Sequence, residues 1–316
     1  MSVEVVTIGE SMVAFIPNSH TALRYVNQFT KVVAGAESNV AVGLVKLGHS
    51  SGWISKLGND EFGQFILREL RGEGVDVSSV LISDTHPTGI MFKQFTNDKD
   101  SSVFYYRDNS AASTFSKDEL NKQYIRDAKI LLISGITPAL SDSCEETTLE
   151  VMRFARKQGI LVCFDPNIRR KLWSEERAKN VLEPLLALSD IVLLGIDEAE
   201  LLLGVSTPPE IVSALRKRDV RWIGIKQGEK GAYVADQNSE ISISPYPVTV
   251  VDTIGAGDAF NAGFLAGLLE NKAIEICGKM GALMGALAVS SYGDFEGLPN
   301  RSSFDSIFDN KQEASR

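Results

Sequence analysis

The chain has 316 residues, 44% of them hydrophobic and 23% charged, and carries a formal net charge of −9. This length and composition are typical of a soluble globular protein with one large core or two smaller ones. The negative charge argues against nucleic-acid binding, which needs a basic face. No apolar run approaches the roughly 20 residues that span a bilayer, so no membrane association is expected. The first residues lack the basic region of a signal peptide, which predicts a cytoplasmic protein.

Strand-like apolar runs alternate with helical patterns along most of the chain. In chain order, strands are predicted at residues 3–9, 51–55, 130–134, 161–164, 191–194, 222–226 and 231–235. Helices are predicted at residues 38–47, 62–73, 144–158, 174–188, 197–203, 209–217, 257–269 and 275–291. Alternating elements of these lengths predict an α/β protein with a mainly parallel sheet that helices cover on both faces.

Two segments, residues 11–31 and 88–110, interrupt this alternation. In the second, two β-prone arms flank a polar turn at residues 97–100, which is typical of a β-hairpin. We expect both segments to form a small β-sheet that acts as a lid over the carboxyl ends of the parallel strands, where such sheets bind ligands. A hairpin that extends the edge of the main sheet is the alternative. The α/β domain would then comprise residues 1–10, 32–87 and 111–308.

The cysteines and histidines offer no reactive motif. Cys144, Cys163 and Cys277 lie far apart and match no metal-binding or nucleophile pattern, so we interpret them as small core residues. The three histidines are isolated and lack the spacing of metal ligands. A zinc enzyme or a Ser-His-Asp hydrolase is therefore not expected.

Residues 252–258 (Asp-Thr-Ile-Gly-Ala-Gly-Asp) open an apolar helix and are the most informative segment of the chain. A Gly-Ala-Gly turn at a helix N-terminus presents free backbone N–H groups to an anion, and the helix dipole adds partial positive charge. Gly255, Ala256 and Gly257 are therefore a candidate anion hole for a phosphoryl group. Asp258 stands where a general base would meet the attacking hydroxyl. A glycine-rich turn that only connects two elements is the alternative.

This segment resembles the C-terminal signature of the ribokinase-like carbohydrate kinases, also called the phosphofructokinase-B type. Residues 34–41 (Ala-Gly-Ala-Glu-Ser-Asn-Val-Ala) are similar to the N-terminal signature of that family, although Ala34 replaces a glycine. The two signatures lie more than 200 residues apart, and strand–helix units fill the interval. The resemblance implies a ribokinase-like three-layer α/β/α fold and an ATP-dependent kinase that phosphorylates a sugar.

Within the family, the chain is most similar to kinases of 2-keto-3-deoxygluconate, a sugar acid. Residues 36–39, 105–107 and 165–169 carry this similarity. The implied reaction transfers the γ-phosphoryl group of ATP to the terminal C6 hydroxyl of the acid. An arginine can hold a carboxylate through two parallel hydrogen bonds, so Arg107 and Arg169 are expected to bind the acid.

The resemblance also implies roles for further residues. The sugar acid would contact Gly35, Asn39, Tyr105, Tyr106, Arg107, Arg169, Asp258 and Asp294. Because adjacent residues of a strand face opposite ways, only one of the two tyrosines can face the sugar, and we expect Tyr106 to do so. The nucleotide would contact Lys226, Gly228, Gly231, Gly255, Gly257 and Ala282. Arg170 is interpreted as an ordinary surface residue.

Magnesium, with ATP, is the implied cofactor. Glu198 would organise the metal through water, although Gly195 replaces the asparagine that the family often has in this motif. A monovalent cation such as K⁺ is a second candidate cofactor. A lid with aromatic strands can pair with another lid, so a homo-oligomer formed through the lid is expected.

Three alternative functions remain open. One is a fructokinase or another neutral-sugar kinase on the same scaffold. A second is a sugar-binding sensor without catalysis, which the retained Asp258 and the intact Gly-Ala-Gly turn argue against. The third is a nicotinamide-dependent oxidoreductase, which is disfavoured because no G-x-G-x-x-G motif follows the first strand.

Overall fold

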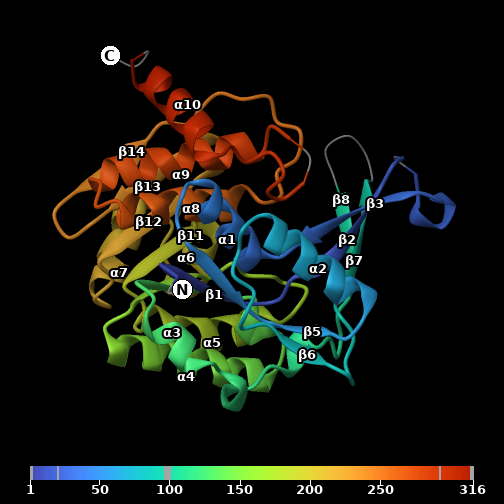
Figure 1. Cartoon of the computed structure of the whole chain (residues 1–316). Coiled ribbons are helices and arrows are strands. Elements are labelled where there is room, and N and C mark those ends of the chain that lie inside the picture. The colour runs from blue at the N-terminus through green and yellow to red at the C-terminus, as the bar shows by residue number, and fades with distance from the viewer. Residues whose placement is uncertain (1–2, 20, 96–100, 292, 314–316) are drawn as a thin grey trace.

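The computed structural model describes residues 3–19, 21–95, 101–291 and 293–313 (Figure 1). An eight-stranded sheet in the order β14-β13-β12-β11-β10-β9-β1-β4 forms the centre of this described chain. Its strands are β1 (Val5–Ile8), β4 (Ser51–Ile54), β9 (Ile130–Ser134), β10 (Leu161–Asp165), β11 (Ile191–Gly195), β12 (Trp222–Lys226), β13 (Ala232–Ala235) and β14 (Glu240–Ile243). Six strands are parallel, and β13 and β14 continue one edge in antiparallel pairing.

Helices cover both faces of this sheet and bury an apolar core on each side. One layer contains α1 (Ala36–Lys46), α2 (Glu61–Gly72), α8 (Ala256–Leu269), α9 (Ile274–Ala288) and α10 (Arg301–Glu313). The other contains α3 (Lys122–Arg126), α4 (Asp142–Gln158), α5 (Glu175–Leu186), α6 (Ile196–Leu203) and α7 (Pro208–Arg216). Figure 1 shows α8, α9 and α10 on one side of the sheet and α3, α4 and α5 on the other. The predicted three-layer α/β/α architecture is confirmed.

Local sequence explains where the main elements begin and end. All five residues of β9 are buried, as expected for a parallel strand with helices on both faces. Ser141 caps the N-terminus of α4, because its side chain accepts the backbone N–H of Cys144, and Gly159 in the left-handed conformation caps the C-terminus. Asp60 caps α2 in the same way by accepting the N–H of Gly63.

A separate four-stranded sheet in the order β3-β2-β7-β8 stands beside the main one (Figure 1). Its strands are β2 (Met12–Pro17), β3 (Phe29–Ala34), β7 (Ile90–Phe95) and β8 (Ser101–Tyr106). β7 and β8 pair antiparallel as the predicted hairpin, while the polar turn at residues 97–100 lies outside the described residues. The hairpin pairs with β2 and not with the main sheet, which excludes the alternative of an edge extension.

The remaining elements are short. β5 (Lys56–Gly58) and β6 (Leu81–Ser83) form a two-stranded parallel sheet. Single 3₁₀ turns lie at Leu23–Tyr25, Ala112–Thr114, Lys117–Glu119, Thr137–Ala139 and Gly228–Lys230. The three cysteines are unpaired and buried, which confirms their interpretation as core residues. In the part of the chain that the structure describes, no helix is long and apolar enough to cross a membrane.

We predict that Gly263→Ala destabilises the contact between α8 and α9. A Cβ at this position would lie 2.5 Å from the carbonyl oxygen of Met280, a backbone atom that cannot move aside by rotating a side chain. The free energy of unfolding should fall by about 1–3 kcal/mol, measured by denaturant titration. Gly72→Ala, in α2, is the matched control because a Cβ there would meet no other atom within 4 Å. An equal loss in both variants would contradict the prediction.

Candidate active site

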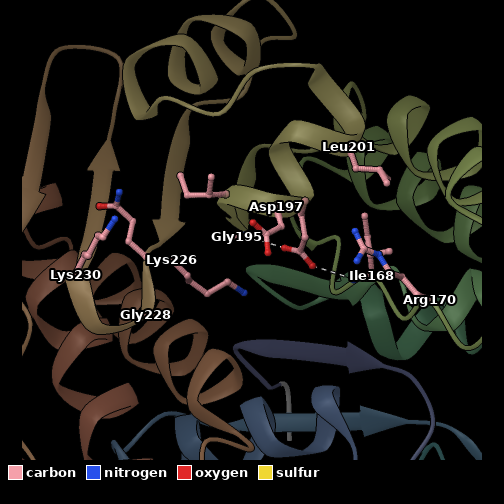
Figure 2. A pocket seen from close by; sticks show the side chains of 11 residues that line it. Ile168, Arg170, Gly195, Asp197, Leu201, Lys226, Gly228 and Lys230 are labelled. Atoms are coloured by element: carbon pink, nitrogen blue, oxygen red, sulfur yellow. Dashed lines mark hydrogen bonds between the residues drawn. The ribbon is translucent and has the colours of Figure 1, made fainter.

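The candidate site lies at the carboxyl ends of the neighbouring parallel strands β10, β11 and β12. A cavity of about 710 Å³ opens there. Its lining includes Ile168, Arg170, Glu198, Lys226, Gly228 and Lys230. Figure 2 shows the Lys226 side chain reaching from β12 into this cavity, in the direction of Gly195 at the end of β11.

The turn before α8 has the geometry of an anion site. Gly255 caps the helix with a φ of +78°, a conformation that favours glycine. A Cβ on Gly255 would also lie 2.5 Å from the carbonyl oxygen of Asp294, so no side chain fits. The N–H groups of the first turn of α8 have no partner within the helix, and the dipole adds partial positive charge. The turn can therefore accept a phosphoryl group.

The Lys226 ammonium adds a full positive charge beside this turn. Its Nζ lies 3.6 Å from the position that a Cβ on Gly257 would take. Asp165 accepts hydrogen bonds from Lys226 Nζ at 2.7 Å and from Asn261 Nδ2 at 2.6 Å. Burial lowers the pKa of Lys226, but the negative charges of Asp165 and Glu198 outweigh burial and raise the pKa above its usual value. Lys226 therefore stays charged at neutral pH.

Asn39, Asp258 and Asp294, far apart in the sequence, meet at the N-terminus of α8. Asn39 Nδ2 donates hydrogen bonds to Asp258 Oδ2 at 2.8 Å and to Asp294 Oδ2 at 3.0 Å. Burial raises the pKa of Asp258 to about 6, while the hydrogen bond from Asn39 acts in the opposite direction. Burial also raises the pKa of Asp294 to about 7, and the charge of Asp258 adds to this effect. A carboxyl group that titrates near neutrality is suited to accepting a proton from a hydroxyl.

Glu37, in the first turn of α1, is a buried carboxyl group to which the sequence analysis gave no role. It accepts hydrogen bonds from Ser134 Oγ at 2.5 Å and from Thr137 Oγ1 at 3.1 Å. Burial raises its pKa to about 7. A Cβ on Gly9 would lie 2.1 Å from the carboxyl carbon of Glu37, so the chain after β1 runs directly over this group. Glu37 therefore ties the start of α1, and with it Asn39, to the ends of β1 and β9.

Arg107 lies at the end of the hairpin, on the same side as Tyr105. Its guanidinium carbon is 5.5 Å from the centroid of the Tyr105 ring, and it forms a buried ion pair with Glu10. Ser110 Oγ donates a hydrogen bond to Glu10 at 2.5 Å and holds that carboxylate in place. Arg107 Nε has no partner among the described residues and can serve a ligand. Arg169 is close enough to Asp258 for its positive charge to lower the pKa of that carboxyl.

Tyr105 and Tyr106 lie on opposite faces of the four-stranded sheet. We call the face with Met12, Ala14, Ala34, Met91, Val103 and Tyr105 the inner face. Tyr106 is 65% exposed on the other face, where its ring meets Phe92 edge-on at 5.8 Å. The alternation of β8 thus turns Tyr105 to the inner face, beside Arg107, and Tyr106 to the opposite face.

The other predicted residues are divided between the site and its surroundings. A Cβ on Gly35 would lie 2.5 Å from Oγ of Ser11, which lies between β1 and β2, so α1 starts in close contact with this connection. Gly228 lines the cavity, whereas Gly231 and Ala282 do not line the cavity that the described residues form. Gly231 makes a left-handed turn before β13, and Ala282 packs against the core from α9. Arg170, interpreted as an ordinary surface residue, lines the cavity.

Glu198 already uses both of its carboxylate oxygens. One accepts the backbone N–H of Ile168 and the other that of Gly195, each at 2.8 Å. Burial and the charge of Asp165 raise its pKa. Over residues 3–19, 21–95, 101–291 and 293–313, no group of three or more His, Cys, Asp and Glu side chains could hold a metal ion.

Comparison with known proteins finds relatives over nearly the whole chain. The chain matches the pfkB family carbohydrate kinases over residues 3–301. It is 43% identical over 304 residues to the 2-dehydro-3-deoxygluconokinase of Bacillus subtilis (strain 168), with 95% of this chain and 94% of that protein covered. The crystal structure of 2-dehydro-3-deoxygluconokinase from Thermotoga maritima has a TM-score of 0.91 at 25% identity, covering 97% of this chain and 99% of that one.

A putative ribokinase II from E. coli, solved in complex with ATP and Mg²⁺, also has a TM-score of 0.91 at 25% identity, covering 98% of this chain and 100% of that one. The likeness extends over the main sheet, its helices and the four-stranded sheet, because nearly the whole of each chain is covered. The chain belongs to the pfkB family of carbohydrate kinases and has the ribokinase-like fold.

Proposed function

We propose that this kinase transfers the γ-phosphoryl group of ATP to the C6 hydroxyl of 2-keto-3-deoxygluconate, also called 2-dehydro-3-deoxygluconate. The observation that carries the proposal is the placement of Asp258, with its raised pKa, at the mouth of a turn that Lys226 flanks. The name of the Bacillus subtilis relative supports the choice of sugar. Two arginines support an acidic substrate: Arg169, whose charge acts on Asp258, and Arg107, at the end of the hairpin beside Tyr105.

In the proposed reaction, Asp258 accepts the proton of the C6 hydroxyl while the oxygen bonds to the γ-phosphorus. The bond from that phosphorus to the bridging oxygen breaks, and ADP leaves with the electron pair. Lys226 and the N–H groups of residues 255–257 stabilise the charge on the γ-phosphoryl oxygens. The proton passes from Asp258 to solvent after the product leaves.

Mg²⁺ is inferred to accompany ATP, as in the complex of the E. coli relative. Mg²⁺ usually keeps several waters and is held by one or two carboxylates and the substrate phosphates, so a cage of three protein ligands is not needed. Each Glu198 oxygen has a lone pair left beside its backbone hydrogen bond, which fits a contact through a metal-bound water. The bound ion would neutralise phosphate charge. A monovalent cation stays a prediction.

The sugar acid would lie between the inner face of the four-stranded sheet and Asp258. Its carboxylate would pair with Arg107 and Arg169, and its hydroxyls with Asn39, Asp294 and Tyr105. One observation favours a neutral sugar such as fructose as the second candidate: Glu10 already neutralises Arg107. A substrate carboxylate must share that guanidinium, whereas a neutral sugar need not.

The four-stranded sheet, within residues 11–31 and 88–110, would act as the lid of this site. Its face opposite the inner face leaves Phe104 46% and Tyr106 65% exposed. Exposed aromatic side chains on a sheet favour contact with another protein surface. This supports the prediction of a homo-oligomer formed through the lid.

We predict that Asp258→Asn lowers turnover by roughly 10²- to 10⁴-fold, because the amide cannot accept the hydroxyl proton. The KM values for sugar and ATP should change little, since the side chain keeps its size. ADP release in a coupled assay gives both parameters, and thermal unfolding checks that the variant is folded. A folded variant with near-normal turnover would exclude Asp258 as the base.

The acid limb of the pH profile should report the pKa of Asp258. The base must be deprotonated to work, so kcat/KM should fall as the pH drops through about 6. Asn39→Ala removes a hydrogen bond that lowers this pKa, so the acid limb should move to higher pH. An acid limb that stays in place or moves to lower pH in the variant would contradict the assignment.

Arg107→Met and Arg169→Met should harm the sugar acid more than a neutral sugar. Loss of a hydrogen-bonded charge partner is expected to lower kcat/KM for 2-keto-3-deoxygluconate roughly 10- to 100-fold. The same assay with fructose gives the comparison, and Arg68→Met, an exposed arginine of α2, is the control. A wild-type enzyme that prefers fructose, with equal losses for both sugars, would favour the neutral-sugar kinase.

A further inference from the structure

Lys93 is a charged residue on the inner face of the four-stranded sheet, beside the apolar side chains that define this face. It follows Met91 by two residues on β7, so both side chains point to the same face. Lys93 is only 2% exposed. A buried ammonium group is costly unless a partner neutralises it. Its partner is Asp252, whose Oδ2 lies 2.6 Å from Lys93 Nζ.

Asp252 is the first residue of the turn that ends at α8. Its second oxygen, Oδ1, accepts the N–H of Ile254 at 3.2 Å, inside the turn. Its own N–H donates to the carbonyl oxygen of Val289 at 3.3 Å, and the preceding N–H of Val251 donates to the same oxygen at 2.7 Å. Asp252 therefore binds the backbone of the turn through one carboxylate oxygen and Lys93 through the other.

The ion pair joins two parts of the proposed site that are 159 residues apart in the sequence. On one side, the inner face of the four-stranded sheet carries Tyr105 and leads to Arg107, which we propose to contact the sugar. On the other, Gly255 follows Asp252 by three residues in the same turn and caps α8.

We infer that Lys93 is a positioning residue, which sets the phosphoryl-binding turn relative to the sugar-binding sheet through Asp252. The inference rests on the proposed function. The turn must present its N–H groups to the γ-phosphoryl group while the sheet presents the sugar hydroxyl to the same phosphorus. A misplacement of about 1 Å between reacting groups can cost about 100-fold in rate. Lys93 holds this spacing without contact to substrate.

The test compares wild type, Lys93→Met and Lys93→Arg in the coupled kinase assay. We expect Lys93→Met to lower kcat roughly 10- to 100-fold, with KM for the sugar kept in the same order of magnitude. Lys93→Arg keeps the charge and should recover most of kcat. Lys56→Met is the matched control, because it breaks a lysine–glutamate pair of 2.7 Å, also partly buried, in another part of the fold. Thermal unfolding of each variant separates loss of fold from loss of rate.

A double-mutant cycle tests whether Lys93 acts through Asp252. Asp252→Asn keeps an oxygen for the N–H of Ile254 but loses the charge, so it also covers the case in which Lys93→Met does not fold. The double variant should be no slower than the slower single variant, because both changes break one link. The inference would be overturned if the two single-variant losses in kcat multiply in the double variant, or if a folded Lys93→Met enzyme has normal kcat. A wild-type enzyme that phosphorylates no sugar would instead refute the proposed function.

Discussion

The gathering of positive charge at one end of α8 is the constraint on which the site depends. The chain carries a net charge of −9, and ATP is a polyanion. A negatively charged protein therefore needs local positive charge to bind ATP. The free N–H groups of the first turn of α8 and the Lys226 ammonium supply this charge at one point. Lys226 keeps its charge because Asp165 faces it across β11, the strand between β10 and β12. The order of strands in the sheet thus places the Lys226 ammonium next to the N–H groups of the turn, and both contribute positive charge to the site.

Three buried carboxyl groups near the start of α8 would give the site its acid–base chemistry. Asp258, Asp294 and Glu37 all have raised pKa values, and in each case burial is the largest cause. One amide nitrogen, Nδ2 of Asn39, serves both aspartates. The packing that buries Asp258 therefore holds the pKa of the proposed base close to neutrality.

Most main-sheet strands were predictable because their apolar runs are continuous, as burial on both faces requires. The helix α10 was not predicted, although Phe304 and Phe308, four residues apart, stack on one of its faces. β14 was missed because it is short and half exposed at an edge of the sheet. The sequence could not assign Tyr105 and Tyr106 to the two faces of the sheet, because the face of each depends on the pairing of β8 with β7.

The fold class, the family and the glycine turn proposed to bind the phosphoryl group were predictable from the sequence. They follow from local patterns, namely strand and helix periodicity and glycines that need a particular backbone conformation. Which polar groups meet depends instead on the tertiary structure. Asp165 with Lys226, Glu10 with Arg107, and Lys93 with Asp252 are pairs from distant segments. Electrostatic contacts depend on distance in space, and the sheet order and strand register that set this distance are not written in any local stretch of the chain.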